Sequence, residues 1–159
     1  MRKSIVTPEN TRAVPAGGQW FDLEQIAHVE ITSEDSNFPI ENALGSGETT
    51  GWRASTPGPQ VIRLIFDGPQ TIRQIQVHFV ERTVERSQEF AIFAGSAGEL
   101  REVVRQQWSF SPQGSTEEIE DYSKELDGIG VLELRIDPDR SHDPKLSKAF
   151  ASLQSLKVA

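Results

Sequence analysis

The sequence predicts a single all-β domain, either a sandwich or a barrel. From Trp20 onward, short runs rich in Ile, Val, Leu and Phe alternate with clusters of Gly, Pro, Ser and Asp, and no long stretch shows a helical period. A chain of 159 residues can form one core that buries roughly two-thirds of its unfolded surface. No segment repeats with a period of about 20 to 50 residues, which excludes solenoids and propellers.

Eight runs are predicted as strands because apolar side chains recur at every second position or fill the run. They are residues 25–31, 60–66, 71–80, 89–94, 102–108, 118–125, 131–136 and 153–158. The clearest is 71–80, where Ile75, Val77 and Phe79 alternate with polar residues. In 131–136, the side chains of Leu132, Leu134 and Ile136 are expected inside and those of Glu133 and Arg135 outside.

Turn-forming residues divide these runs. Residues 67–69, Asp-Gly-Pro, predict a tight connection between the second and third strands, because proline has no N–H for a ladder. Residues 39–44 predict one helical turn. Residues 1–19 have several prolines and glycines and no period, so they are predicted to form a flexible arm before a domain over 20–159.

Composition excludes several classes of protein. The net charge of -8 argues against a nucleic-acid partner, and no stretch approaches the roughly 20 apolar residues of a membrane helix. The chain has no cysteine, and its first residues lack the apolar core of a secretory signal. These features predict a cytoplasmic protein without a disulfide or a thiolate metal site, and no sequence motif calls for a cofactor.

Several motifs occur in an order that resembles the discoidin or coagulation-factor C-type domain and its relatives among carbohydrate-binding modules. They lie in "ITSEDSNFPIENALGSGETTGWRAS", "QVIRLIFDGPQTIRQIQVHF", "RSQEFAIFAGSAGELREVV", "GIGVLELRI" and "SLQSLKV". The resemblance covers about residues 25–158. It implies an eight-stranded antiparallel jelly-roll β-sandwich, galactose-binding domain-like, whose loops bind sugars, lipid head groups or proteins. A fold of this kind does not fix the ligand.

The calcium position of many sugar-binding relatives is degenerate in this sequence. Where such relatives carry Asp-Gly-Asp, this chain has Gly45, Ser46 and Gly47, and Ser155 replaces an acidic residue of the last strand. Calcium prefers several hard oxygen ligands, mostly carboxylates. No metal is therefore expected, although Glu48 and backbone carbonyls remain near this degenerate site.

Alternating strand directions place four connections, 53–59, 81–87, 109–116 and 137–146, at the same end of the sandwich, and the resemblance adds the loop 33–39. The predicted ligand-binding residues at this end are Phe38, Arg82, Arg86, Trp108, Phe110 and His142. An aromatic ring covers the apolar face of a sugar, while arginine and histidine supply hydrogen bonds that fix its orientation.

A structural role is the alternative for most of these residues. Trp108 and Phe110 share a strand face with Val104, which is typical of a core, and Arg82 and Arg86 suit a solvated loop with weak ion pairs. Trp52 and Arg53 are both expected to be structural. The three histidines are too dispersed for a metal site.

The sequence offers no Gly-x-Ser-x-Gly elbow and no cysteine nucleophile, so no catalytic residue is assigned. The resemblance implies a non-catalytic carbohydrate-binding module that recognises a glycan through its loops. The alternative is an intracellular protein–protein interaction module of the same fold without a sugar ligand. A third possibility is an accessory domain that has lost its ligand.

Overall fold

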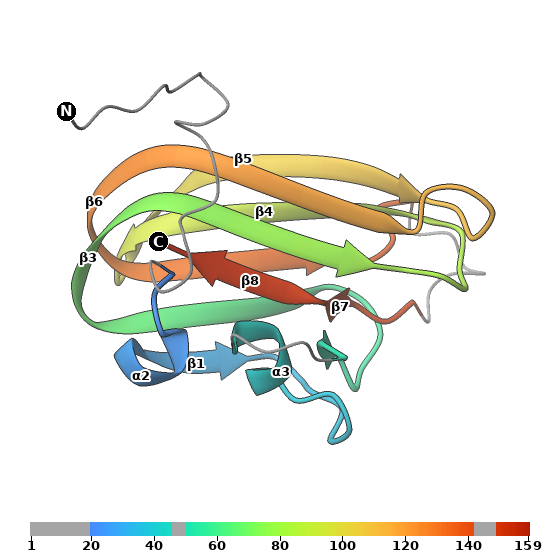
Figure 1. The fold of residues 1–159 in the computed structure, drawn as a ribbon, viewed down its shortest axis with the longest axis horizontal. Coiled ribbons are helices and arrows are strands. Elements are labelled where there is room, and N and C mark those ends of the chain that lie inside the picture. The colour runs from blue at the N-terminus through green and yellow to red at the C-terminus, as the bar shows by residue number, and fades with distance from the viewer. Residues whose placement is uncertain (1–19, 46–49, 142–148) are drawn as a thin grey trace, which may run out of the picture.

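A computed structural model describes residues 20–45, 50–141 and 149–159 of the chain. The strands form two antiparallel layers that face one another, and two long strands, β3 and β6, run from one layer into the other (Figure 1). The elements in chain order are α2 (Leu23–Ile26), β1 (Ala27–Ile31), α3 (Glu41–Leu44), β2 (Trp52–Arg53), β3 (Gln60–Val80), β4 (Arg86–Ser96), β5 (Glu99–Phe110), β6 (Glu117–Asp137), β7 (Ser152–Leu153) and β8 (Ser155–Val158). The predicted all-β sandwich is confirmed, while the predicted arm over 1–19 lies outside the described residues.

The larger layer has the strand order β1, β3, β6, β4, β5 and uses the first part of β3 and the last part of β6. Leu64 of β3 lies between Val29 of β1 and Leu132 of β6 in this layer. In the smaller layer, Val77 in the second part of β3 lies between Glu120 of β6 and Leu156 of β8. A separate short pair joins β2 to β7.

The Asp67-Gly68-Pro69 segment does not connect two strands, as the sequence predicted, but lies inside the continuous strand β3. The ladder between β3 and β6 shifts register between Ile65 and Gln70, so proline stands where no ladder hydrogen bond is needed. The predicted runs 118–125 and 131–136 likewise belong to one strand, β6. The backbone bends at these positions but stays extended. Turn-forming residues in a sequence do not show whether a strand bends and continues or ends in a turn.

Other boundaries differ by a few residues. Gln25 and Ile26, predicted to start the first strand, belong to α2, and β2 was not predicted at all. The helical turn expected within 39–44 is confirmed as α3. These short elements have too few residues for a period to show in the sequence.

The core lies between the two layers and follows the predicted alternation. Ile75, Val77 and Phe79 are buried, as are Leu132, Leu134 and Ile136 on β6. The rings of Phe79 in the smaller layer and Phe90 in the larger layer pack with centroids 5.1 Å apart. Trp52 is also fully buried, and its Nε1 donates to the Ser33 carbonyl at 3.1 Å, so its predicted structural role is confirmed.

One end of the sandwich collects the connecting loops, as the strand count predicted, and is called here the loop end (Figure 1). Backbone hydrogen bonds tie the loops together: Glu81 donates to Thr116 at 2.8 Å, and Asp35 donates to Arg53 at 2.8 Å. The opposite end, where β3 and β6 cross between layers, is called the bend end. No helix among the described residues has the length and apolar character needed to cross a membrane.

Candidate functional site

Two adjoining hollows, of about 290 and 260 Å³, open at the loop end and together form what is called here the loop-end pocket. Both are lined by Arg53, Val80, Arg82 and Ser152. The larger hollow also includes Phe150, and the smaller one includes Phe38, Thr50 and Gln154. Of the six predicted ligand-binding residues, Phe38, Arg82 and Arg86 therefore line this pocket.

Phe38 and Arg53 are placed by a short backbone pairing between the loop before α3 and strand β2. The Asp35 carbonyl accepts from Phe38 N at 2.8 Å, and the Phe38 carbonyl accepts from Arg53 N at 3.1 Å. The guanidinium carbon of Arg53 lies 4.5 Å from the centre of the half-buried Phe38 ring. This cation–π contact places the guanidinium of the exposed Arg53 over one face of the Phe38 ring.

Arg53 is a pocket residue that the sequence analysis assigned to structure. Its neighbour Trp52 is buried, and neighbouring side chains of a strand point to opposite sides, so Arg53 is exposed. If Trp52 is taken as buried in an extended segment, alternation predicts that the next side chain, Arg53, is exposed. Phe150, whose exposed fraction is 47%, was also missed. It lies in a loop, where no strand alternation predicts whether an aromatic side chain is buried or exposed.

Arg82 follows directly after β3, and 63% of its side chain is exposed. Its Nη2 lies 3.7 Å from Glu117 Oε1, and His78 Nε2 lies 3.7 Å from the same oxygen. The distance between Arg82 and Glu117 is long, and both side chains are exposed, so this ion pair contributes little. Arg82 is free to change partner when a ligand arrives.

Arg86 lies below the pocket surface, with a side chain only 1% exposed. It donates to Glu81 Oε1 at 2.8 Å, Gln88 Oε1 at 3.1 Å and the Pro138 carbonyl at 2.8 Å. Its guanidinium also lies 5.0 Å from the centre of the Phe110 ring. These contacts give Arg86 a structural role, and its predicted ligand contact stays a prediction.

Glu81 completes this anchor of the loop after β3. Burial raises the pKa of its carboxyl, but the hydrogen bonds from Arg86 and Thr83 outweigh burial and hold that pKa below its ordinary value. The same carboxylate accepts from the Thr83 backbone at 3.1 Å and from Val84 N at 3.4 Å. The loop that carries Arg82 is therefore fixed by a buried ion pair.

Phe110 and Trp108 lie on the core side of β5 and do not line the loop-end pocket. Phe110 is 1% exposed, while Trp108 is half-buried against the core opposite Gln88 of β4. Both positions agree with the core role that the strand face shared with Val104 indicates, and their predicted ligand contacts stay predictions. His142, the remaining predicted residue, lies outside the described residues.

The degenerate calcium position is described only in part. Gly45 ends α3, and Ser155 pairs with His78 at the start of β8, whereas Gly47 and Glu48 fall in the gap between the described ranges. Within residues 20–45, 50–141 and 149–159, no group of three or more His, Asp or Glu side chains is arranged to hold a metal ion.

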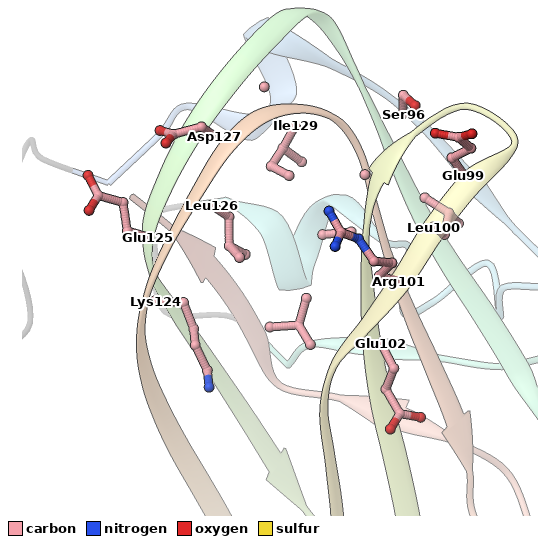
Figure 2. Close-up of a pocket in the computed structure, with 14 residues that line it drawn as sticks. Ser96, Glu99, Leu100, Arg101, Glu102, Lys124, Glu125, Leu126, Asp127 and Ile129 are labelled. Atoms are coloured by element: carbon pink, nitrogen blue, oxygen red, sulfur yellow. The ribbon is translucent and has the colours of Figure 1, made fainter.

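A larger cleft, of about 820 Å³, opens at the bend end between the β4–β5 turn and the bend of β6 (Figure 2). Arg101 points from β5 toward its centre, and Leu126 and Ile129 lie across from it on the bend of β6. Charges of both signs surround it, from Lys124 and the carboxylates Glu99, Glu102, Glu125 and Asp127. With Arg101, two positive charges stand against four negative ones, so the lining does not favour an anionic ligand. None of the predicted site residues lines this cleft.

A buried carboxyl lies between the layers on β6. Burial and the charge of Glu120 raise the pKa of Glu118 from its ordinary 4.5 to about 8. Gln88 Nε2 donates to Glu118 Oε1 at 3.5 Å, and the other oxygen has no hydrogen-bond partner among the described residues. Burial and these two glutamates also raise the pKa of the neighbouring Tyr122. Glu118 lines neither the loop-end pocket nor the bend-end cleft.

Solved structures with a similar fold include family 32 carbohydrate-binding modules. The module of AlyQ in complex with 4,5-unsaturated mannuronic acid superposes with a TM-score of 0.62 at 20% identity, covering 89% of this chain and 98% of that one. The family 32 module of Clostridium perfringens NanJ, in complex with galactose, gives 0.59 at 18% identity, covering 87% and 96%. A pectin-binding module gives 0.59 at 17% identity, covering 84% and 90%.

Sequence comparison adds no relative: no family model matches the chain, and a search of curated proteins finds no match. The structural likeness extends over nearly the full length of both this chain and the single modules. At identities of 20% or less it shows the fold and not the ligand. The chain therefore has the galactose-binding-like, discoidin-type sandwich that is found in family 32 carbohydrate-binding modules.

Proposed function

We propose that this chain is a non-catalytic carbohydrate-binding module that holds a sugar in the loop-end pocket. The observation that carries the proposal is a preformed pocket at the loop end. Its lining includes the guanidinium groups of Arg53 and Arg82 and the ring of Phe38, one face of which Arg53 covers. An aromatic ring packs on the apolar face of a sugar ring, and guanidinium groups donate to its oxygens.

The size and rigidity of the pocket support this function. Each hollow lies at or just below the lower end of the roughly 300 to 1,000 Å³ typical of small-molecule sites, which suits one or two sugar residues. The buried Arg86 and Glu81 pair fixes the loop that bears Arg82, so little ordering is needed on binding. Further support comes from similar structures. Two were solved in complex with 4,5-unsaturated mannuronic acid and with galactose, and a third is a pectin-binding module.

Glycan-array screening of the purified chain, with and without calcium, tests the proposal. We expect binding to at least one glycan, independent of calcium, and loss of that binding in Phe38→Ala. The matched control is Arg101→Ala, which changes an exposed side chain at the bend end and should bind as the unaltered chain does. Binding that survives Phe38→Ala and disappears in Arg101→Ala would place the sugar in the other cleft.

The second candidate is an intracellular protein–protein interaction module that uses the same loop end. The burial of Phe110 and the placement of Trp108 against the core favour it, because they remove two of the three aromatic residues predicted for the sugar platform. An absence of binding across the array, with the chain folded, would favour this candidate over the carbohydrate-binding module.

A further inference from the structure

The charge of the loop-end pocket is opposite to that of the chain. The chain carries a net charge of -8, from 24 acidic and 16 basic residues. The described residues that line the two hollows include three arginines, Arg53, Arg82 and Arg86, and one carboxylate, Glu81. Three positive charges against one negative charge leave the lining at +2 and create a local positive field, which favours an anionic ligand.

The two positive charges that remain are accessible. Glu81 is engaged by the buried Arg86, so these two groups neutralise one another below the surface. Arg53 and Arg82 are exposed, and both belong to the wall shared by the two hollows. A ligand that occupies either hollow therefore meets both guanidinium groups.

These arginines are also weakly engaged by the protein. Among the described residues, Arg53 has a contact with the Phe38 ring and no carboxylate within salt-bridge distance, and Arg82 reaches only Glu117 at 3.7 Å. On the outer face of the larger layer the pattern is different. There, Arg63 and Arg135 hold Glu133 at 2.7 and 2.5 Å.

We propose that the loop-end pocket selects sugars that carry a carboxylate, with Arg53 and Arg82 binding the carboxylate and Phe38 packing against the sugar ring. The planar guanidinium donates two parallel hydrogen bonds to a carboxylate, a geometry that lysine and neutral side chains do not reproduce. The inference rests on the proposed function, since it names the class of sugar bound by the same pocket.

The test compares ligands that differ only in charge. Isothermal titration measures binding of the full chain to oligogalacturonate and oligomannuronate, to the methyl ester of each, and to neutral galactan. We expect at least one free acid to bind about tenfold more tightly than its ester, a difference that shrinks as salt is added. A sulfated galactan is included to separate carboxylate recognition from a general affinity for anions.

Variants of the pocket arginines test which residues cause the preference for the acid over the ester. Arg82→Gln and Arg53→Gln are expected to lower the affinity ratio of acid to ester toward one, because each variant weakens binding of the acid more than binding of the ester. Arg53→Lys keeps the charge but removes the planar donor pair, so it is expected to retain less than half of the preference. Arg101→Gln, at the bend end, is the matched control and should leave the ratio unchanged.

The outcomes separate the two proposals. Equal affinity for acids, esters and galactan would overturn the carboxylate preference and leave the carbohydrate-binding function standing. Tight binding of sulfated galactan without binding of either uronate would also overturn it. A folded chain that binds no saccharide on the array or by titration would overturn both the preference and the proposed function.

Discussion

The substitution Glu118→Gln replaces a buried carboxyl with an amide of nearly the same shape. Glu118 is 1% exposed and lies on the inner side of β6, where Gln88 is its one hydrogen-bond donor at 3.5 Å among the described residues. Burial and the nearby charge of Glu120 raise its pKa from 4.5 to about 8, so the folded protein keeps this group protonated near neutral pH. The unfolded chain, in water, does not.

The sign and size of the effect follow from proton linkage. Between the unfolded pKa of 4.5 and the folded pKa of about 8, the folded state binds more protons at Glu118, so the free energy of unfolding falls as pH rises. Each pKa unit corresponds to about 1.4 kcal/mol, and integration from pH 5 to 8 gives a loss of about 3 kcal/mol. Below pH 4.5 both states hold the proton, and the effect vanishes.

Urea unfolding at pH 5, 6, 7 and 8 measures this loss. Glu118→Gln should match the unaltered chain near pH 5 and exceed it by about 3 kcal/mol at pH 8, because the amide does not ionise. Glu125→Gln, at an exposed position on the same strand, is the control and should follow the unaltered chain at every pH. Parallel curves for Glu118→Gln and the unaltered chain from pH 5 to 8 would refute the reasoning.

Three further outcomes are expected. Arg86→Met leaves the buried carboxylate of Glu81 without its cation, so the free energy of unfolding at pH 7 should fall by about 3 to 5 kcal/mol in urea; a loss below about 1 kcal/mol would contradict a structural role for Arg86. Gly51→Ala should also destabilise the chain, by about 1 to 3 kcal/mol, since Gly51 has φ 76° and an added Cβ would lie 2.6 Å from the Leu153 carbonyl oxygen. An unchanged urea midpoint would contradict this expectation and would mean that the backbone around the β2–β7 pair moves to accept the added Cβ at little cost. Addition of calcium is expected to leave the melting temperature unchanged, and a rise of several degrees would show that the degenerate site still binds the ion.

The layers of this fold could be predicted because burial here follows strand alternation. Six of the eight predicted runs lie wholly in strands, and the runs 25–31 and 153–158 do so for most of their length. The counting of strand ends placed the loops at the correct end. What alternation cannot show is whether a strand bends or stops. Asp67-Gly68-Pro69 has the composition of a turn, yet β3 continues through it, because the register shift supplies a position where proline needs no partner.

The candidate site was predicted less completely, for a reason that Arg86 illustrates. Alternation from the buried Phe90 back through Gln88 places Arg86 on the inner face, but an arginine in the core is expected only when a partner neutralises it. That partner, Glu81, lies at the other end of a loop whose shape the sequence does not define. Arg53 is the opposite case. The sequence analysis expected it to be structural, but because Trp52 is buried, the next side chain points toward the pocket.

The outer face of the larger layer shows why a ligand is expected at the loop end and not on the sheet. Glu133 lies there between Arg63 and Arg135, and their hydrogen bonds overcome the effect of burial and lower its pKa. An anion that bound these arginines would have to leave Glu133 buried without a partner, at a cost of about 3 to 5 kcal/mol. At the loop end, Arg53 and Arg82 lose little beyond bound water and a long contact with Glu117. An anion at the loop end therefore binds without breaking a strong ion pair. An anion on the outer face of the larger layer would bind more weakly, because its contacts would first have to offset the loss of the ion pairs of Glu133.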